Sequence, residues 1–310
     1  MDAIVVDMLA KSYRPVWPWE NAATVLSDIS LSVAQGEIFG FVGHNGAGKT
    51  TTMKILLGLL RATSGRVELL GFPAEDVAVR ARIGYLPESP YFYDYLTAEE
   101  FLCFYGRLAG LDRETIQKRI PQLLERVSLT EDRHRQLRKF SKGMLQRIGL
   151  AQALIHDPEL VILDEPMSGL DPIGRKEVRD LIMGLRDQGK TVFFSTHIIS
   201  DVEMICDRVG ILSRGRMHAL GRIEDLVSEH AARSVEVVCD GVVGDDLPEV
   251  KRLASRTLQR GDRCLIILPG QDHLEEILAV LRRSGGKLVS VIPHKDSLEE
   301  IFLEKTNQEV

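Results

Sequence analysis

The stretch Gly43-His-Asn-Gly-Ala-Gly-Lys49-Thr50 decides the fold. It fits the phosphate-loop pattern G-x-x-x-x-G-K-[ST], in which glycines let backbone N–H groups crowd around phosphate oxygens. The residues before it predict a strand over 37–42 and those after it a helix over 50–60, so strand, loop and helix follow in the required order. A chance match in a chain of this length is on the order of one per cent. The stretch therefore predicts a phosphate-binding site in an α/β fold.

The polar residues of this loop each have a chemical role open to them. Lys49 would neutralise the β- and γ-phosphates of a nucleotide, and Thr50 would offer its hydroxyl to Mg²⁺. The positive end of the following helix would favour the same anion. Nine residues are expected to contact the nucleotide: Gly43, His44, Asn45, Gly46, Ala47, Gly48, Lys49, Thr50 and Thr51.

A second motif narrows the chemistry, because a phosphate loop alone leaves kinases, GTPases and many ATPases open. It is Leu160-Val-Ile-Leu-Asp164-Glu165-Pro166, an apolar run that ends in two carboxylates. Asp164 is placed to hold Mg²⁺ through water, and Glu165 to polarise an attacking water. Such a pair taken alone is more often a solvated strand end. A phosphate loop more than a hundred residues earlier favours the catalytic interpretation.

The third motif, Phe140-Ser141-Lys142-Gly143-Met144, resembles the signature of the ATP-binding cassette (ABC) family, usually written LSGGQ. Lys142 and Met144 replace the usual glycine and glutamine, a departure that resembles the bacterial export-type ATPases handling drugs and lipids. A serine at a helix N-terminus presents a hydroxyl and unpaired backbone donors to a γ-phosphate. In the family this motif contacts ATP on the other subunit. The resemblance therefore implies a second cassette, identical or different, arranged head to tail.

Further positions match the family in order. Asp171 closes the Ser168-Gly-Leu-Asp171 loop that communicates between the two sites, and His197 matches the histidine that contacts the γ-phosphate. Tyr13 stands where the family stacks an aromatic ring on adenine, with Trp17 or Trp19 as alternatives. The resemblance implies four catalytic residues, Glu165, His197, Lys49 and Asp171, and nucleotide contacts from Tyr13, Ser141 and Gly143 besides the loop.

Glu88 falls where the family usually has a glutamine that touches the metal and senses the membrane partner. It keeps an oxygen ligand but adds negative charge near Mg²⁺, so a solvated loop carboxylate stays open as the alternative. If Glu88 is taken as a metal ligand, the implied metal residues are Thr50, Asp164 and Glu88. The aromatic stretch from Tyr91 to Tyr95 is too apolar for an idle loop. In ABC transporters this surface receives a short helix of the membrane subunit, so the resemblance suggests permease docking near Glu88 to Leu96.

Composition limits location and partners. A net charge of −6 and a pI near 5.8 lack the basic excess of a nucleic-acid binder, so no nucleic-acid partner is expected. Apolar runs are a few residues long, whereas a membrane-spanning helix takes about 20, and the N-terminus lacks a basic signal region. We expect a cytoplasmic protein, peripheral on the inner face of the membrane through the permease. The four cysteines are far apart and form no C-x-x-C pair, which argues against a disulfide framework and against a zinc site. They are Cys103, Cys206, Cys239 and Cys264.

The resemblance implies a P-loop NTPase ABC cassette of class α/β: a RecA-like parallel-sheet core with an antiparallel β subdomain and a helical subdomain. We place the cassette at 1–221, its helical subdomain at about 89–150, a helical joint at 222–232 and a small C-terminal accessory α/β domain at 233–310. A helical pattern covers 97–127, with Thr97 and Glu100 spaced as a capping box. The C-terminal domain is expected to hold strands near 235–238, 264–268 and 289–292, a helix over 273–283, and a last helix from Ser297.

The function that the resemblance implies is an ATP-hydrolysing subunit, with ATP and Mg²⁺ as ligands, that powers a separate membrane subunit of an ABC exporter. The same cassette also serves soluble ABC ATPases that act on nucleic acid or ribosomes, and this is the main alternative. The single cassette, the acidic balance and the absence of a coiled-coil insertion disfavour it. A third class, a GTPase or small-molecule kinase with the same phosphate loop, would leave the signature motif unexplained. The chain also lacks the N-K-x-D motif that recognises guanine.

Overall fold

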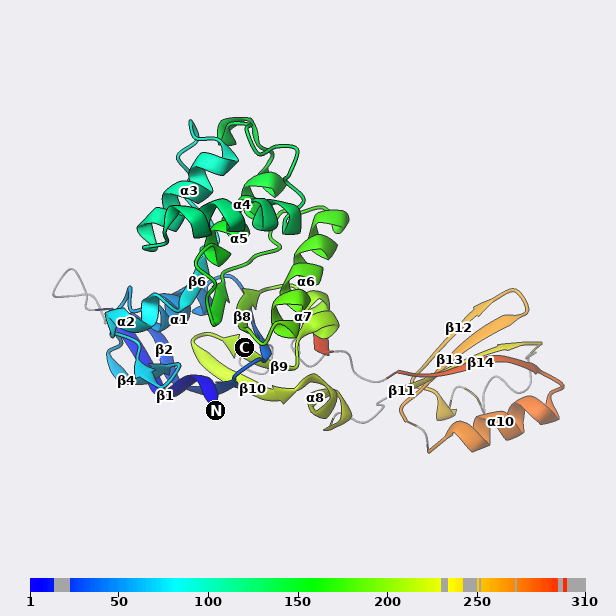
Figure 1. Ribbon diagram of the computed structural model, residues 1–310. Coiled ribbons are helices and arrows are strands. Elements are labelled where there is room, and N and C mark those ends of the chain that lie inside the picture. Colours follow the sequence, from blue (N-terminus) through cyan, green and yellow to red (C-terminus); the bar gives the residue numbers. More distant parts are fainter. Residues whose placement is uncertain are drawn as a thin grey trace. The chain divides into compact units, whose positions relative to one another are not determined.

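The computed structural model describes residues 1–13, 23–229, 234–241, 250, 252–270, 272–294 and 298–299. The chain divides into two compact units, Met1–Arg222 and Ile223–Val310. The loop with both tryptophans and the capping box of the last helix, Ser297 with Glu300, lie outside the described residues. Each unit is described by itself (Figure 1).

The first unit is built on a six-stranded core sheet with the strand order β10-β9-β3-β8-β7-β6. Strands β9, β3, β8, β7 and β6 pair in parallel, and β10 joins β9 antiparallel at one edge. The apolar runs 160–163 and 191–194 are confirmed as interior strands, because every residue of β7 and β8 is buried. The strands are β3 (Ile38–Gly43), β6 (Ile83–Leu86), β7 (Leu160–Leu163), β8 (Thr191–Thr196), β9 (Arg208–Ser213) and β10 (Arg216–Arg222).

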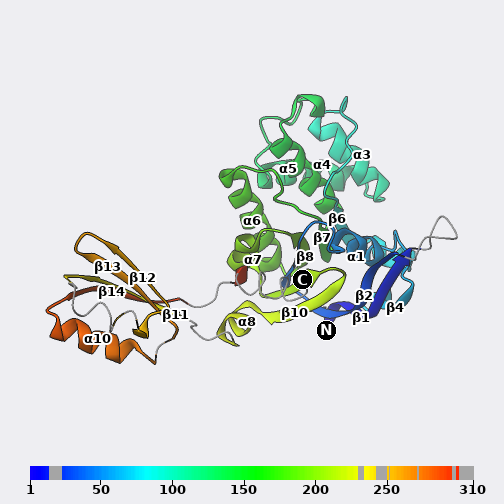
Figure 2. The same ribbon diagram turned by 180° about the vertical axis from the view of Figure 1, so that it is seen from behind.

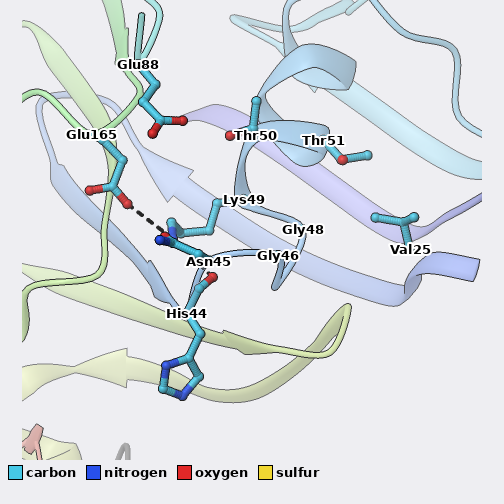
Figure 3. A pocket seen from close by; sticks show the side chains of 10 residues that line it. All are labelled: Val25, His44, Asn45, Gly46, Gly48, Lys49, Thr50, Thr51, Glu88 and Glu165. Atoms are coloured by element: carbon cyan, nitrogen blue, oxygen red, sulfur yellow. Dashed lines mark hydrogen bonds and ion pairs between the residues drawn. The ribbon is translucent and has the colours of Figure 1, made fainter. Parts of the chain in front are cut away.

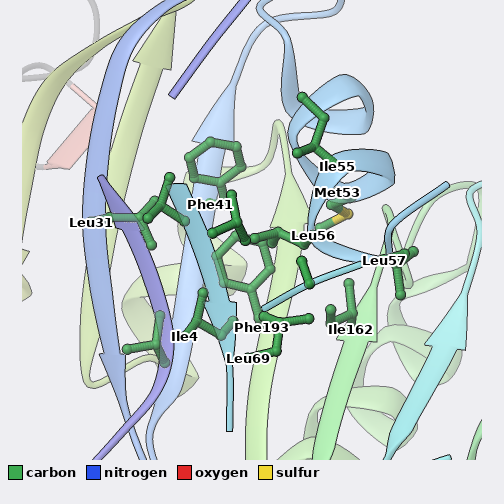
Figure 4. Close-up of a cluster of buried hydrophobic side chains, with 14 of the residues drawn as sticks. Ile4, Leu31, Phe41, Met53, Ile55, Leu56, Leu57, Leu69, Ile162 and Phe193 are labelled. Carbon is green, nitrogen blue, oxygen red and sulfur yellow. The ribbon is translucent and has the colours of Figure 1, made fainter. Parts of the chain in front are cut away.

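A second, antiparallel sheet with the order β2-β1-β4-β5 packs against the core sheet. Its strands are β1 (Asp2–Tyr13), β2 (Ala23–Ala34), β4 (Ser64–Leu69) and β5 (Phe72–Pro73). Buried side chains from both sheets and from helix α1 (Lys49–Leu56) form one apolar cluster, which includes Ile4, Phe41, Leu56 and Phe193 (Figure 4). This cluster holds α1, and with it the phosphate loop, against the core.

Helix α1 differs from the helix predicted over 50–60, since it begins at Lys49 and ends at Leu56. Gly58 has a φ of 64°, a left-handed conformation that ends helices at little cost for glycine. The helix therefore ends before Gly58, and the chain continues to β4.

Three helices form a separate layer at one end of the first unit: α3 (Ala98–Leu108), α4 (Arg113–Arg126) and α5 (Lys142–Leu154) (Figure 1). The capping box at Thr97 and Glu100 is confirmed, because each side chain bonds the other residue's backbone N–H. The helical pattern predicted over 97–127 is two helices, since Gly110 takes a φ of 79° and Asp112 then caps α4. Two shorter elements are α2 (Val77–Arg80) and the 3₁₀ turn η1 (Leu137–Lys139).

Helices α6 (Pro172–Asp187) and α7 (Ile199–Ile205) cover the core sheet at β3 and β8. They lie on the side of that sheet away from β1 and β2, as both views show (Figures 1 and 2). The core sheet is thus covered on both faces, which its fully apolar strands require. Within the described part of the chain, none of the helices has the length and apolar character to cross a bilayer.

The second unit begins with α8 (Ile223–Glu229) and contains a four-stranded antiparallel sheet of order β12-β13-β11-β14 with the helix α10 (Leu274–Arg283). Its core joins one face of β11 and β13 to α10, with Val237, Ile266 and Ile277 fully buried. The predicted strands and helix are confirmed, whereas β12 was not predicted. The strands are β11 (Ser234–Asp240), β12 (Arg256–Arg260), β13 (Arg263–Leu268) and β14 (Lys287–His294). All four cysteines are free thiols.

Candidate nucleotide-binding site

A cavity of about 360 Å³ opens where β3 runs into α1, within the range of about 300–1,000 Å³ typical of ligand sites. The loop predicted from sequence forms most of its wall (Figure 3). The cavity is lined by Val25, His44, Asn45, Gly46, Gly48, Lys49, Thr50, Thr51, Glu88 and Glu165.

The backbone of the loop requires glycine at position 48. Gly48 has a φ of 112°, and a Cβ built there would approach Leu26 Cδ2 to 2.5 Å. As the N-cap of α1, Gly48 places the first N–H groups of that helix at the cavity, and no acidic side chain occupies the first turn. Free N–H groups and the helix dipole together favour an anion at this point.

Lys49 is buried with its ammonium inside the site. Nζ donates to the carbonyl of Gly43 at 2.6 Å and lies 3.2 Å from Glu165 Oε1. Burial makes this charge a strong attractor, because few water molecules screen it. Lys49 is therefore held ready for a second anion, while its present anionic partner is Glu165.

Asp164 stands at the end of β7 and has no exposed surface. Its Oδ1 accepts a hydrogen bond from Ser195 Oγ at 2.6 Å, whereas the buried Oδ2 has no hydrogen-bond partner among the described residues. Burial, followed by the charge of Asp164, raises the pKa of Tyr85 to about 12. A buried carboxylate oxygen without a partner is costly unless a cation or its water meets it. The unpartnered Asp164 Oδ2 thus fits a contact with Mg²⁺ or with one of its water ligands.

Glu165 follows directly and takes a left-handed backbone conformation, with a φ of 49°. This conformation costs about 1–2 kcal/mol for a residue with a Cβ. It turns the carboxylate into the cavity, where Oε2 lies 2.9 Å from His197 Nδ1 and Oε1 meets Lys49. His197 thus orients the carboxylate through one oxygen, and the charge of Lys49 attracts the other, which has no hydrogen bond among the described residues.

Glu88 and Thr50 complete the metal residues named by the sequence. Both line the cavity, and the Glu88 carboxylate and the Thr50 hydroxyl face each other across it (Figure 3). The structure therefore brings Glu88 to the site, although its contact with a metal stays a prediction.

Five predicted nucleotide-binding residues do not line this cavity: Tyr13, Gly43, Ala47, Ser141 and Gly143. The predicted catalytic residue Asp171 does not line it either. Tyr13 is 43% exposed, and the Lys11 ammonium lies 5.0 Å from its ring centre. Ser141 caps α5 by accepting from the N–H of Met144 at 3.3 Å, with Gly143 in the same turn. Asp171 caps α6 by accepting from the N–H of Gly174 at 2.8 Å. Their contacts with nucleotide stay predictions.

Sequence reasoning missed three residues of the site. Val25 on β2 lines the cavity, Ser195 bonds Asp164, and buried Gln146 donates to the Pro166 carbonyl at 3.0 Å. Gln146 belongs to the signature helix α5, so this bond ties that helix to the loop after Glu165. The available signal for Ser195 was a polar residue directly after the apolar run of β8. That run ends level with the end of β7, since Phe194 pairs with Leu163.

Comparisons with known proteins agree with this geometry. Residues 26–168 match the family described as ABC transporter. An uncharacterized ABC transporter ATP-binding protein of Synechocystis sp. is 42% identical over 97% of this chain and 83% of that protein. A linearmycin resistance ATP-binding protein of Bacillus subtilis is 33% identical over 92% and 94%. A solved ATP-binding subunit of an ABC transporter, 31% identical, superposes with a TM-score of 0.64 over 73% of this chain and 92% of that one. The chain belongs to the ABC transporter ATP-binding proteins, ATPases that bind ATP with Mg²⁺ and power a transporter.

Proposed function

We propose that this chain powers an ABC exporter and that Glu165 is the base that activates water for attack on the γ-phosphate of ATP. The observation that carries this assignment is the Glu165 carboxylate, which lies between Lys49 Nζ at 3.2 Å and His197 Nδ1 at 2.9 Å. Among the described residues that line the cavity, Glu88 is the only other carboxylate. Glu165 is the one that has both a hydrogen bond with His197 and an ion pair with Lys49.

The mechanism is one of positioning and charge. The N–H groups at the start of α1 and the Lys49 ammonium hold the phosphates, so that Lys49 exchanges Glu165 for the γ-phosphate. The freed carboxylate then accepts the proton of the attacking water, and His197 keeps its orientation. When bound beside Thr50, Asp164 and Glu88, Mg²⁺ would neutralise phosphate charge.

Proteins of this family dimerise and work with separate membrane permeases. We place Ser141, Gly143 and Asp171 at the nucleotide of a second cassette, identical or different, in a head-to-tail pair. None of the three lines the cavity of its own chain, and each lies at a helix N-terminus, where N–H groups would face a partner's γ-phosphate. Tyr13 would stack on the adenine of the nucleotide that binds to the phosphate loop of its own chain.

The permease would dock near Glu88 to Leu96. Tyr91 is 84% and Tyr95 61% exposed, and Tyr93 joins them to Phe104 of α3 by edge-to-face contacts. Exposed rings gathered next to the cavity residue Glu88 supply the apolar area that a short helix would cover. Through this contact the chain would be peripheral on the inner face of the membrane. The resistance function named for the Bacillus subtilis relative supports export as the direction.

We assign the ATPase cassette to residues 1–221, with the helical subdomain at about 89–150. Residues 233–310 would form an accessory domain attached through the joint at 222–232. The division into compact units after Arg222 supports this assignment.

Co-expression with the membrane protein encoded beside this chain tests the proposal. The wild type is expected to copurify with the permease and hydrolyse ATP, whereas Glu165→Gln should copurify and hydrolyse ATP about 10²- to 10⁴-fold more slowly. Tyr91→Ser with Tyr95→Ser should lose the permease, and Leu108→Ser, also exposed, serves as the control. Wild-type turnover in Glu165→Gln would contradict the base, and full copurification of the double tyrosine variant would contradict the docking surface.

A further inference from the structure

Ser195 connects the two carboxylate residues of the site although it contacts neither the cavity nor solvent. Strand β8 lies between β3 and β7 in the core sheet, with Phe41 paired to Ser195 and Leu163 to Phe194. This register places Ser195 level with Asp164, the residue that follows Leu163. The serine is therefore built into the middle of the sheet at the edge where the site begins.

Its hydroxyl makes two hydrogen bonds with opposite roles. Ser195 Oγ donates to Asp164 Oδ1 at 2.6 Å and accepts from the backbone N–H of Glu165 at 3.0 Å. A hydroxyl has one proton, so the bond to Asp164 uses its only donor and orients its lone pairs toward Glu165. One rigid group thus sets the orientation of two neighbouring residues.

The two bonds have different consequences. With Oδ1 occupied, Asp164 is left with Oδ2, the buried oxygen that has no partner among the described residues. The bond to the Glu165 N–H holds the residue whose φ is 49°, a conformation that needs support from its surroundings. We infer that Ser195 is a positioning residue that aims Asp164 at the metal and holds Glu165 in its left-handed conformation. The inference rests on the roles proposed above for Asp164 and Glu165.

A serine that only satisfied buried polar groups would affect stability alone. A positioning serine also changes how strongly the metal adds to nucleotide affinity. Thr191 at the other end of β8 offers a matched control, because its buried hydroxyl accepts from the N–H of Gly36 at 3.0 Å, away from the carboxylates.

The test compares Ser195→Ala with Thr191→Ala in the full chain. Binding of a non-hydrolysable ATP analogue is measured with Mg²⁺ and with EDTA, and hydrolysis of ATP is measured alongside. Ser195→Ala should lower kcat and the Mg²⁺-dependent gain in affinity by about 10- to 100-fold, the usual effect of removing a residue that orients a metal ligand. Affinity in EDTA should stay at the wild-type value. Thr191→Ala should lower only the melting temperature.

A second pair separates the hydroxyl from side-chain volume. Ser195→Thr keeps the hydroxyl, whereas Ser195→Val has a methyl group where threonine has the hydroxyl, so the two variants have nearly the same volume. Only the threonine variant should keep the Mg²⁺-dependent gain in affinity. If neither folds, Ser195→Ala against Thr191→Ala decides alone. A wild-type Mg²⁺-dependent gain in Ser195→Ala overturns the inference. Wild-type hydrolysis by Glu165→Gln, measured in parallel, would instead overturn the proposed base and leave the Ser195 result to be judged by metal binding.

Discussion

Lys49 and Glu165 form an ion pair of 3.2 Å inside the phosphate-loop cavity, and their side chains are only 6% and 7% exposed. The lysine that would hold the phosphates is thus paired with the carboxylate that would activate water. Both charges are shielded from solvent, so water screens their attraction less than that of a surface salt bridge. Nucleotide binding must exchange one anionic partner of Lys49 for another.

Replacing Lys49 should weaken ATP binding. Lys49→Met keeps the apolar part of the side chain but removes the ammonium, and losing charge-assisted hydrogen bonds should cost about 2 kcal/mol, or roughly 30-fold in Kd. Lys54→Met on the exposed side of the same helix is the control. Equilibrium ATP binding measures both, and equal affinities would exclude Lys49 as the phosphate ligand.

Glu165→Gln should bind ATP more tightly than the wild type while hydrolysing it about 10²- to 10⁴-fold more slowly. Binding improves because Lys49 loses its competing anion and the γ-phosphate no longer meets a carboxylate. Glu159→Gln, which lies beside β7 and pairs with Arg82, is the control. Phosphate release and nucleotide affinity are the measurements, and weaker binding would contradict the proposed exchange at Lys49.

His197→Ala should lower kcat and leave ATP affinity nearly unchanged. The imidazole lies 2.9 Å from Glu165 Oε2, and a hydrogen bond to a charged group contributes about 1.5–3 kcal/mol, or roughly 10- to 100-fold in rate. His134→Ala is the control, because His134 is 80% exposed on the helical layer. Steady-state kinetics decide, and a raised KM with normal kcat would assign His197 to binding alone.

The ion pair between Arg179 of α6 and Asp201 of α7 should stabilise the first unit. Asp201 is 2% exposed and lies 2.8 Å from the Arg179 guanidinium. Arg179→Met leaves a buried carboxylate unpaired, which costs about 3 kcal/mol of unfolding free energy. Arg186→Met removes an exposed charge of the same helix and should cost less than about 1 kcal/mol. Urea unfolding of both variants tests the difference, and equal losses would refute it.

His156 should make stability depend on pH. Burial lowers the pKa of His156 below its ordinary 6.5, and its Nε2–H donates to the Ile83 carbonyl at 3.0 Å. The unfolded chain therefore binds more protons than the folded chain, so stability falls as pH falls through about 6.5 toward the lower folded pKa. His156→Gln keeps a donor without titrating and should lose less stability between neutral pH and about pH 5.5. His134→Gln, exposed, should match the wild type at both pH values.

Much of the fold could be predicted because local pattern and tertiary context agree. The glycines, Lys49 and Thr50 predicted the strand, loop and helix that β3 and α1 confirm. The apolar runs of β7 and β8 predicted buried parallel strands. Strand β12 could not be predicted, because Arg-Thr-Leu-Gln-Arg has a single apolar residue and becomes a strand through its hydrogen bonds to β13.

The sequence by itself determined the chemistry of the site, since the phosphate loop and the Asp164–Glu165 pair are short motifs whose residue types and order carry that chemistry. Only the tertiary structure decided which side chains meet. Lys49 reaches Glu165, and Ser195 reaches Asp164, across separations of 116 and 31 residues. The physical reason is that such contacts depend on strand order and register, which follow from packing the whole core and leave no trace in the spacing of a motif.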